Sequence, residues 1–208
     1  MQGLQRPYAA LAALLGWFAL GLQLHLMFGY AALNGETPLL SILRFFSFFT
    51  VVTNTIAAIS LSLSAFGRSN FMTRPNTQAA IAVYIFVVSL IYTLLLRNLW
   101  NPSGEQRLAD TLLHYAMPAL YLLYWILFVP KEPLRYSGTI AWLICPAVYV
   151  VFALWRGAVT GQYPYPFLDA GRLGYAHIAL NIAGLGAVFL GFGLVAVFLG
   201  KAIARTGR

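Results

Sequence analysis

Six long apolar stretches constrain this chain more than any other feature, because each is close to the roughly 20 residues that a helix needs to cross a bilayer. Only 9% of the 208 residues are charged and 61% are hydrophobic, whereas a soluble domain carries about 25% charge. The sequence therefore predicts an all-α bundle of six transmembrane helices, forming one domain over residues 1–208, with helices at approximately 8–33, 45–66, 78–96, 108–129, 139–155 and 174–200.

The stretches are joined by short connections rich in Gly, Pro and Asn, which end helices. Short connections force successive helices to run antiparallel, which predicts an up-and-down bundle. The first stretch follows Arg6 and is too long for the apolar part of a signal peptide. We therefore expect it to be retained as the first transmembrane helix.

Basic residues predict the orientation of this bundle in a cell membrane, because cytoplasmic loops carry an excess of Lys and Arg. Eight lie at the termini or in even-numbered loops and five in odd-numbered loops, which favours cytoplasmic termini. The eight are Arg6, Arg68, Arg74, Lys131, Arg135, Lys201, Arg205 and Arg208, and the five are Arg44, Arg97, Arg107, Arg156 and Arg172. Despite the net charge of +8, they are scattered singly, which argues against nucleic-acid binding.

The fourth stretch carries an ionisable pair, Asp110 and His114. Residues four apart share a helical face, and ionisable residues inside a membrane usually mark function. Pro118 cannot donate to the carbonyl of His114, so the helix should be distorted at the histidine. The alternative is structural: Asp110 caps the helix and His114 bonds to a neighbouring helix.

Polar side chains of all six helices fall at similar depths near the outer leaflet. Thr50 and His114 each lie about six residues inside their predicted helices, or roughly 9 Å from the membrane surface. Such a layer predicts a pocket on the outer side, although a hydrogen-bonded seam between helices would give the same pattern. The expected pocket residues beside this pair are Ser47, Thr53, Asn54, His25, Tyr92, Arg156, His177 and Asn181.

One chemistry for this layer is nucleophilic catalysis. Ser47, Thr50 and Asn54 share a face of the second helix, and a hydroxyl becomes a nucleophile only beside a base. His114 is the candidate base, and Asp110 could orient its ring. Asn54, Asn181 or Tyr92 could donate to a developing oxyanion. A threonine that only bonds back to its own helix is the alternative for Thr50.

Two other chemistries remain open. His25, His114 and His177 could converge on a haem or a metal ion, although they lack a short-spacing ligand motif. Arg156, Asp110 and the Pro118-broken helix could instead line a transport path, although the chain has no repeat symmetry. The expectation from the residues is that no metal or cofactor is required.

The fifth connection, residues 156–169, contains two prolines and several aromatic residues. Prolines restrict the backbone, and aromatic side chains suit the membrane interface. The segment is expected to form an ordered lid or a re-entrant turn over the polar layer. An aromatic anchor at the interface is the alternative.

Three segments carry a family resemblance: residues 44–54 (RFFSFFTVVTN), 112–118 (LLHYAMP) and 163–169 (YPYPFLD). With the six-helix layout, they resemble small bacterial six-pass membrane proteins related to the androgen-induced-gene family, which includes the androgen-dependent regulator of tissue factor pathway inhibitor. The resemblance implies a bacterial inner-membrane protein. It also implies an intramembrane hydrolase of fatty acid esters of hydroxy fatty acids, with a threonine nucleophile matching Thr50, or its neighbour Thr53, and a histidine matching His114.

Together these patterns favour a lipid-ester hydrolase in which Thr50 attacks an acyl ester, His114 takes its proton and Asp110 orients His114. The expected partners are membrane lipids and the acyl-ester substrate. The alternatives are a non-catalytic lipid or small-molecule binder, or a transporter, using the same pocket, and a histidine-ligated haem or metal protein.

Overall fold

A computed structural model describes residues 2–206, and all of the regular secondary structure in that range is helical. Its α-helices are α1 (Gln2–Leu33), α2 (Pro38–Phe45), α3 (Phe49–Ala65), α4 (Pro75–Ile91), α5 (Gly104–Thr111), α6 (Met117–Phe128), α7 (Gly138–Trp142), α8 (Ile144–Thr160) and α9 (Ala170–Thr206). Two π-helical turns, Tyr92–Leu96 and Leu112–Ala116, extend α4 and join α5 to α6. Two short 3-10 turns lie at Phe71–Thr73 and Pro166–Leu168.

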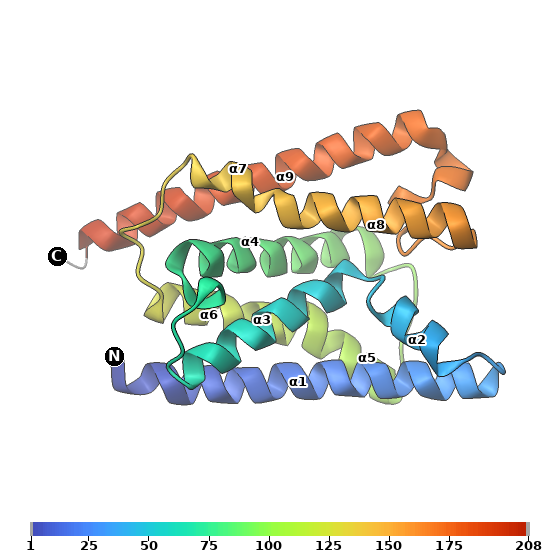
Figure 1. Cartoon of the computed structure of the whole chain (residues 1–208), viewed down its shortest axis with the longest axis horizontal. Coiled ribbons are helices and arrows are strands. Elements are labelled where there is room, and N and C mark those ends of the chain that lie inside the picture. The colour runs from blue at the N-terminus through green and yellow to red at the C-terminus, as the bar shows by residue number, and fades with distance from the viewer. Residues whose placement is uncertain (1, 207–208) are drawn as a thin grey trace.

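Helix α4 lies at the centre of the bundle and packs against α3, α6, α7 and α9. It is apolar around its circumference, and residues from Gln78 to Ile85 are all buried, as expected for a helix surrounded by others. Figure 1 shows α1 along one side of the bundle, beneath α3, and α8 and α9 along the other. Both ends of the chain lie at the same end of the bundle (Figure 1).

Five helical segments are long and apolar enough to cross a membrane, and α2 with α3 would make a sixth although they meet at a bend of 80°. The all-helical fold is therefore confirmed, with five to six apolar helices of spanning length. Many large apolar side chains on α1, α8 and α9 face outward, among them Leu11, Val151 and Leu180. A bilayer provides the apolar surroundings that such a surface requires.

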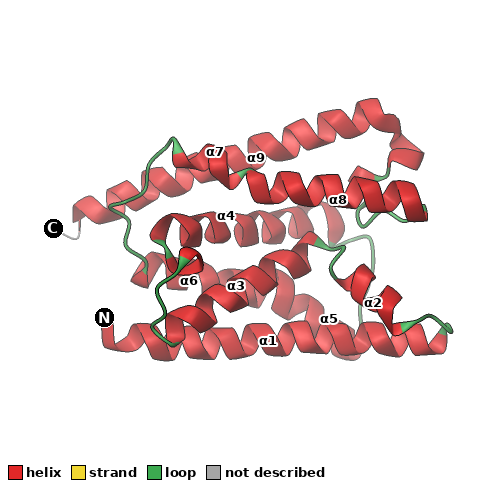
Figure 2. Ribbon diagram, viewed as in Figure 1, coloured by secondary structure: helices red, strands yellow, loops and turns green. Residues whose placement is uncertain are grey.

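The predicted second helix, 45–66, is wrong at its start. Thr37 caps a separate helix, α2, with Pro38 in its first turn, within what the sequence predicted to be a loop. The chain then bends, and α3 begins only at Phe49 (Figure 2). Thr50 consequently lies in the first turn of its helix, not six residues inside it. Hydropathy missed the break because the flanking residues are uniformly apolar.

The remaining helix boundaries also shift. The first begins at Gln2, the third at Pro75 and the fourth at Gly104, because polar end residues were excluded from the apolar stretches. The predicted fifth helix is two helices, α7 and α8, the second of which continues to Thr160. The sixth extends over Ala170–Thr206 and is kinked at Gly174, whose φ of 75° and ψ of 154° are not helical.

Candidate functional site

The fourth predicted helix is distorted at His114, as the position of Pro118 predicts. Residues Leu112–Ala116 form a π-helical turn directly before α6, in which Pro118 occupies the first turn. A π-turn inserts extra backbone into a helix and commonly occurs at functional sites. This π-helical turn places His114 between α3 and the carboxylate of Asp110, which lies one helical turn earlier.

Both ring nitrogens of His114 face oxygen atoms. Nδ1 lies 3.0 Å from the backbone carbonyl oxygen of Asp110 and 3.1 Å from its carboxylate Oδ1. Two oxygen neighbours assign the proton to Nδ1, so Nε2 is the acceptor. Nε2 lies 3.3 Å from the Thr50 hydroxyl, which is oriented to donate to it. Thr50, His114 and Asp110 thus lie in a row, the order in which a nucleophile, a base and an orienting acid would have to lie.

Tyr92 contacts both His114 and Asp110. Its ring stacks on the His114 ring, with centroids 3.7 Å apart and an angle of 13° between the planes. Its hydroxyl donates to Asp110 Oδ2 at 2.5 Å. Asp110 is 6% exposed, so its orientation depends on these neighbours. Because Ser103 is the N-cap of α5, Asp110 does not cap that helix.

Two cavities meet at Thr50. The larger, about 310 Å³, is lined by the site residues Tyr92, Asp110 and His114 and by the amides Gln23 and Gln106; we call it the polar cavity. The smaller, about 240 Å³, lies on the other side of Thr50 among apolar side chains of α4, α8 and α9; we call it the apolar cavity. Thr50, Leu96 and Tyr165 line both.

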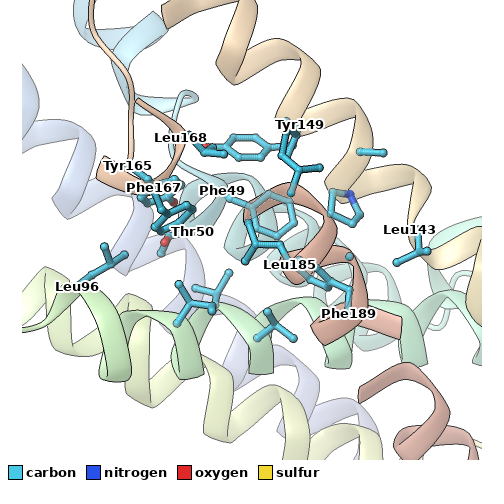
Figure 3. Close-up of a pocket in the computed structure, with 18 residues that line it drawn as sticks. Phe49, Thr50, Leu96, Leu143, Tyr149, Tyr165, Phe167, Leu168, Leu185 and Phe189 are labelled. Atoms are coloured by element: carbon cyan, nitrogen blue, oxygen red, sulfur yellow. The ribbon is translucent and has the colours of Figure 1, made fainter. Parts of the chain in front are cut away.

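Figure 3 shows the apolar cavity, with Thr50, Tyr165 and Phe167 gathered at one end and Phe189 and Leu143 toward the other. Among its described lining residues, only Thr50, Tyr149 and Tyr165 have polar side-chain atoms. Thr50 therefore lies at one end of a chamber whose other lining residues, apart from two tyrosines, are apolar. An engineered apolar cavity of about 150 Å³ binds benzene, so this chamber has room for a larger apolar group.

The loop after α8 forms the wall between the cavities. Arg156 Nη1 donates to the carbonyl of Gln162 at 2.8 Å, and Asn181 Nδ2 donates to that of Phe167 at 2.8 Å. Gly157 allows the Tyr163 ring to pack on α8, since a Cβ there would lie 2.1 Å from that ring. The loop is ordered and borders the site, as one sequence-based interpretation expected, although residues 156–160 belong to α8.

Three predicted pocket residues serve the backbone instead. Thr53 is fully buried, and its hydroxyl donates back to the Phe49 and Thr50 carbonyls. The Asn54 amide donates to the carbonyls of Thr50 and Leu113, and thus braces both halves of the site. The Ser47 hydroxyl donates to Leu43. None of the three lines either cavity.

Four other predicted pocket residues also lie outside both cavities. His25 and His177 are exposed on α1 and α9, while Arg156 and Asn181 hold the loop described above. Equal depth along the helices does not fix the direction in which a side chain points, so these four residues do not join the lining of the two cavities. Among the residues that the structure describes, no three His, Cys, Asp or Glu side chains group to hold a metal ion. The predicted convergence of His25, His114 and His177 is therefore wrong.

Three residues of the site, Tyr165, Gln106 and Gln23, are not among the pocket residues expected from the sequence. Tyr165 borders both cavities, and Gln106 donates to Gln23 at 2.9 Å across the polar cavity. The aromatic, proline-rich loop was the available signal for Tyr165.

Comparisons with protein-family models, with curated proteins and with solved structures found no match.

Proposed function

We propose that this protein is an intramembrane hydrolase of lipid esters, with Thr50 as nucleophile and His114 as general base. The contact of 3.3 Å between the Thr50 hydroxyl and His114 Nε2, at the junction of two cavities, carries the proposal. It slightly exceeds the usual range for a base and its nucleophile, as is common before substrate binds. The resemblance to the androgen-induced-gene family supports the same pair.

The reaction follows from these positions. Thr50 Oγ attacks the ester carbonyl carbon while its proton passes to His114 Nε2. The C–O bond to the alcohol breaks, and His114 returns the proton to the leaving alkoxide. The acyl group is then bonded to Thr50 Oγ. Water, deprotonated by the same Nε2, then attacks the acyl carbon. The bond to Thr50 Oγ breaks, His114 returns the proton to that oxygen, and the fatty acid is released.

Asp110 supports His114 during both transfers. Its carboxylate lies beside the Nδ1 edge of the ring, where positive charge develops when Nε2 takes a proton. Tyr92 holds this carboxylate in place by donating to its other oxygen, Oδ2. Both residues position His114 and stabilise its charge, because neither of them exchanges a proton with the substrate.

The cavities favour an acyl chain as the substrate group. The apolar cavity excludes charged and strongly polar groups, because it has little to hydrogen-bond them. An acyl chain in that chamber brings its carbonyl carbon to Thr50, and the alcohol side of the ester extends into the polar cavity. Membrane lipids are the proposed source of the substrate, with the chain inserted in a cell membrane and both termini cytoplasmic.

The first test is hydrolysis of a fluorogenic long-chain acyl ester by the purified full-length protein in detergent. We expect turnover by the wild type, none by Thr50→Ala or His114→Ala, and normal turnover by the exposed-histidine control His25→Ala. Thermal unfolding of all variants establishes that each is folded. Activity that survives both substitutions would refute the proposal. Saturable binding of the ester by an inactive wild type would support a non-catalytic lipid binder.

A further inference from the structure

The hydrogen-bond donors expected to stabilise an oxyanion are committed elsewhere. The single Tyr92 hydroxyl proton goes to Asp110. Both amide protons of Asn54 are used by backbone carbonyls, and Asn181 donates to Phe167. Ester cleavage at Thr50 therefore needs a donor that the sequence did not indicate, because a tetrahedral oxyanion in an apolar site requires one.

Tyr165 is in the right place to supply it. It lines both cavities beside Thr50, and Figure 3 shows the two side chains gathered at the same end of the apolar cavity. Its ring is held by stacking on Phe167, with centroids 5.1 Å apart and planes at 7°, and by edge contact with Phe48 at 6.1 Å. A rigid ring fixes the direction of its hydroxyl.

The proton of Tyr165 is available for donation. Burial raises the pKa of its phenol above the usual value of 10.0, so the group is protonated at neutral pH. The neighbouring Tyr149 hydroxyl already donates its own proton to the Ser47 carbonyl at 2.7 Å. Tyr149 therefore has no proton left for the carbonyl oxygen of a bound ester and does not compete with Tyr165 as the donor.

The N-terminus of α3 is a second source of positive potential beside Tyr165. The first N–H groups of a helix have no partner within the helix, and the N-cap residue Phe48 provides no side-chain acceptor. Phe49 and Thr50, the first two residues of α3, line the apolar cavity together with Tyr165. An oxygen that gains negative charge here meets the positive end of the helix dipole as well as the phenol.

We propose that Tyr165 is a catalytic residue whose hydroxyl donates a hydrogen bond to the acyl carbonyl oxygen while Thr50 attacks. The proposal rests on the proposed function for its role in turnover. Its core, a contact between the Tyr165 hydroxyl and a bound carbonyl, is independent of whether the ester is cleaved. In the reaction the phenol keeps its proton, and the carbonyl oxygen carries the negative charge until the alcohol leaves.

The kinetic test is Tyr165→Phe, which removes one oxygen and retains the stacked ring. We expect kcat to fall by about 10²–10³, the loss typical of one oxyanion donor, with KM changed by less than about threefold because the acyl chain still binds. The matched control is Tyr163→Phe, the same change in the same loop at a residue outside both cavities. Matching melting temperatures of the variants establish that the loop remains folded.

The second test does not depend on turnover. An ester labelled with ¹³C at its carbonyl is bound to Thr50→Ala and to the double variant Thr50→Ala/Tyr165→Phe, and the carbonyl stretch is measured by infrared difference spectroscopy. We expect a lower stretching frequency in the single variant, since the hydrogen bond weakens the C=O bond, and its loss in the double variant. If the shift is lost in the double variant and the wild type is nevertheless inactive, the contact between Tyr165 and the carbonyl is supported and the hydrolase proposal is refuted.

Two results would overturn the inference. One is an unchanged carbonyl frequency in the double variant, together with a kcat for Tyr165→Phe within threefold of wild type. The other is an ester that does not bind to Thr50→Ala at all, since Tyr165 would then have no carbonyl to hold.

Discussion

Replacing Asp110 by Asn tests how the site stabilises the imidazolium that forms on His114. The substitution preserves the shape of the side chain and an acceptor for the Tyr92 hydroxyl, and removes one buried charge. Asp110 Oδ1 makes no hydrogen bond of its own, while the backbone carbonyl of the same residue accepts from Nδ1. The histidine tautomer should therefore persist, and the effect should be electrostatic.

The magnitude follows from the separation of 3.1 Å between Oδ1 and Nδ1. Unit charges at that distance attract by about 5 kcal/mol at an effective dielectric constant of about 20, and by about 1.3 kcal/mol in bulk water. Since about 1.4 kcal/mol corresponds to a factor of ten in rate, kcat should fall by about 10²–10⁴ for a side chain that is only 6% exposed.

The assay is steady-state hydrolysis of the fluorogenic acyl ester, with kcat and KM measured separately. KM should change little, because Asp110 acts on a charge that is present only during proton transfer. Glu105→Gln is the control, since it removes an exposed acid from the same helix, α5. A fall of less than tenfold for Asp110→Asn would be smaller than the limit for bulk water and would refute the electrostatic role.

Further predictions concern the nucleophile, the apolar cavity and the end of α6. Thr53→Val should leave kcat within about threefold of wild type in the ester assay, because the Thr53 hydroxyl bonds only to backbone. Gly186→Leu should raise KM for long-chain esters and spare short ones, because a Cβ at this lining residue enters open space. Burial lowers the pKa of Lys131 to about 8 from 10.5. Between these two pH values the unfolded chain binds more protons than the folded protein, so the melting temperature should rise with pH over this interval. Lys131→Met should abolish that rise.

The site shows where sequence reasoning succeeds and where it stops. Pro118 and the spacing of Asp110 and His114 are local features, and they predicted a distorted helix with both side chains on one face, which the π-turn provides. The depth of His25 and His177 was also read from the chain, yet both are exposed. Depth along a helix is local, whereas the direction of a side chain depends on how the helix is rotated against its neighbours.

The sequence by itself determined the helical class and five to six apolar helices of spanning length, because every buried backbone group in an apolar medium must be bonded within its own helix. It also indicated Thr50 and His114 as candidates. Only the tertiary structure decided that their side chains lie 3.3 Å apart, that a bend before α3 places Thr50 between two cavities, and that Tyr165 borders both. Residues 50, 114 and 165 are far apart in the chain, and contacts at such separation depend on helix packing that no local pattern records.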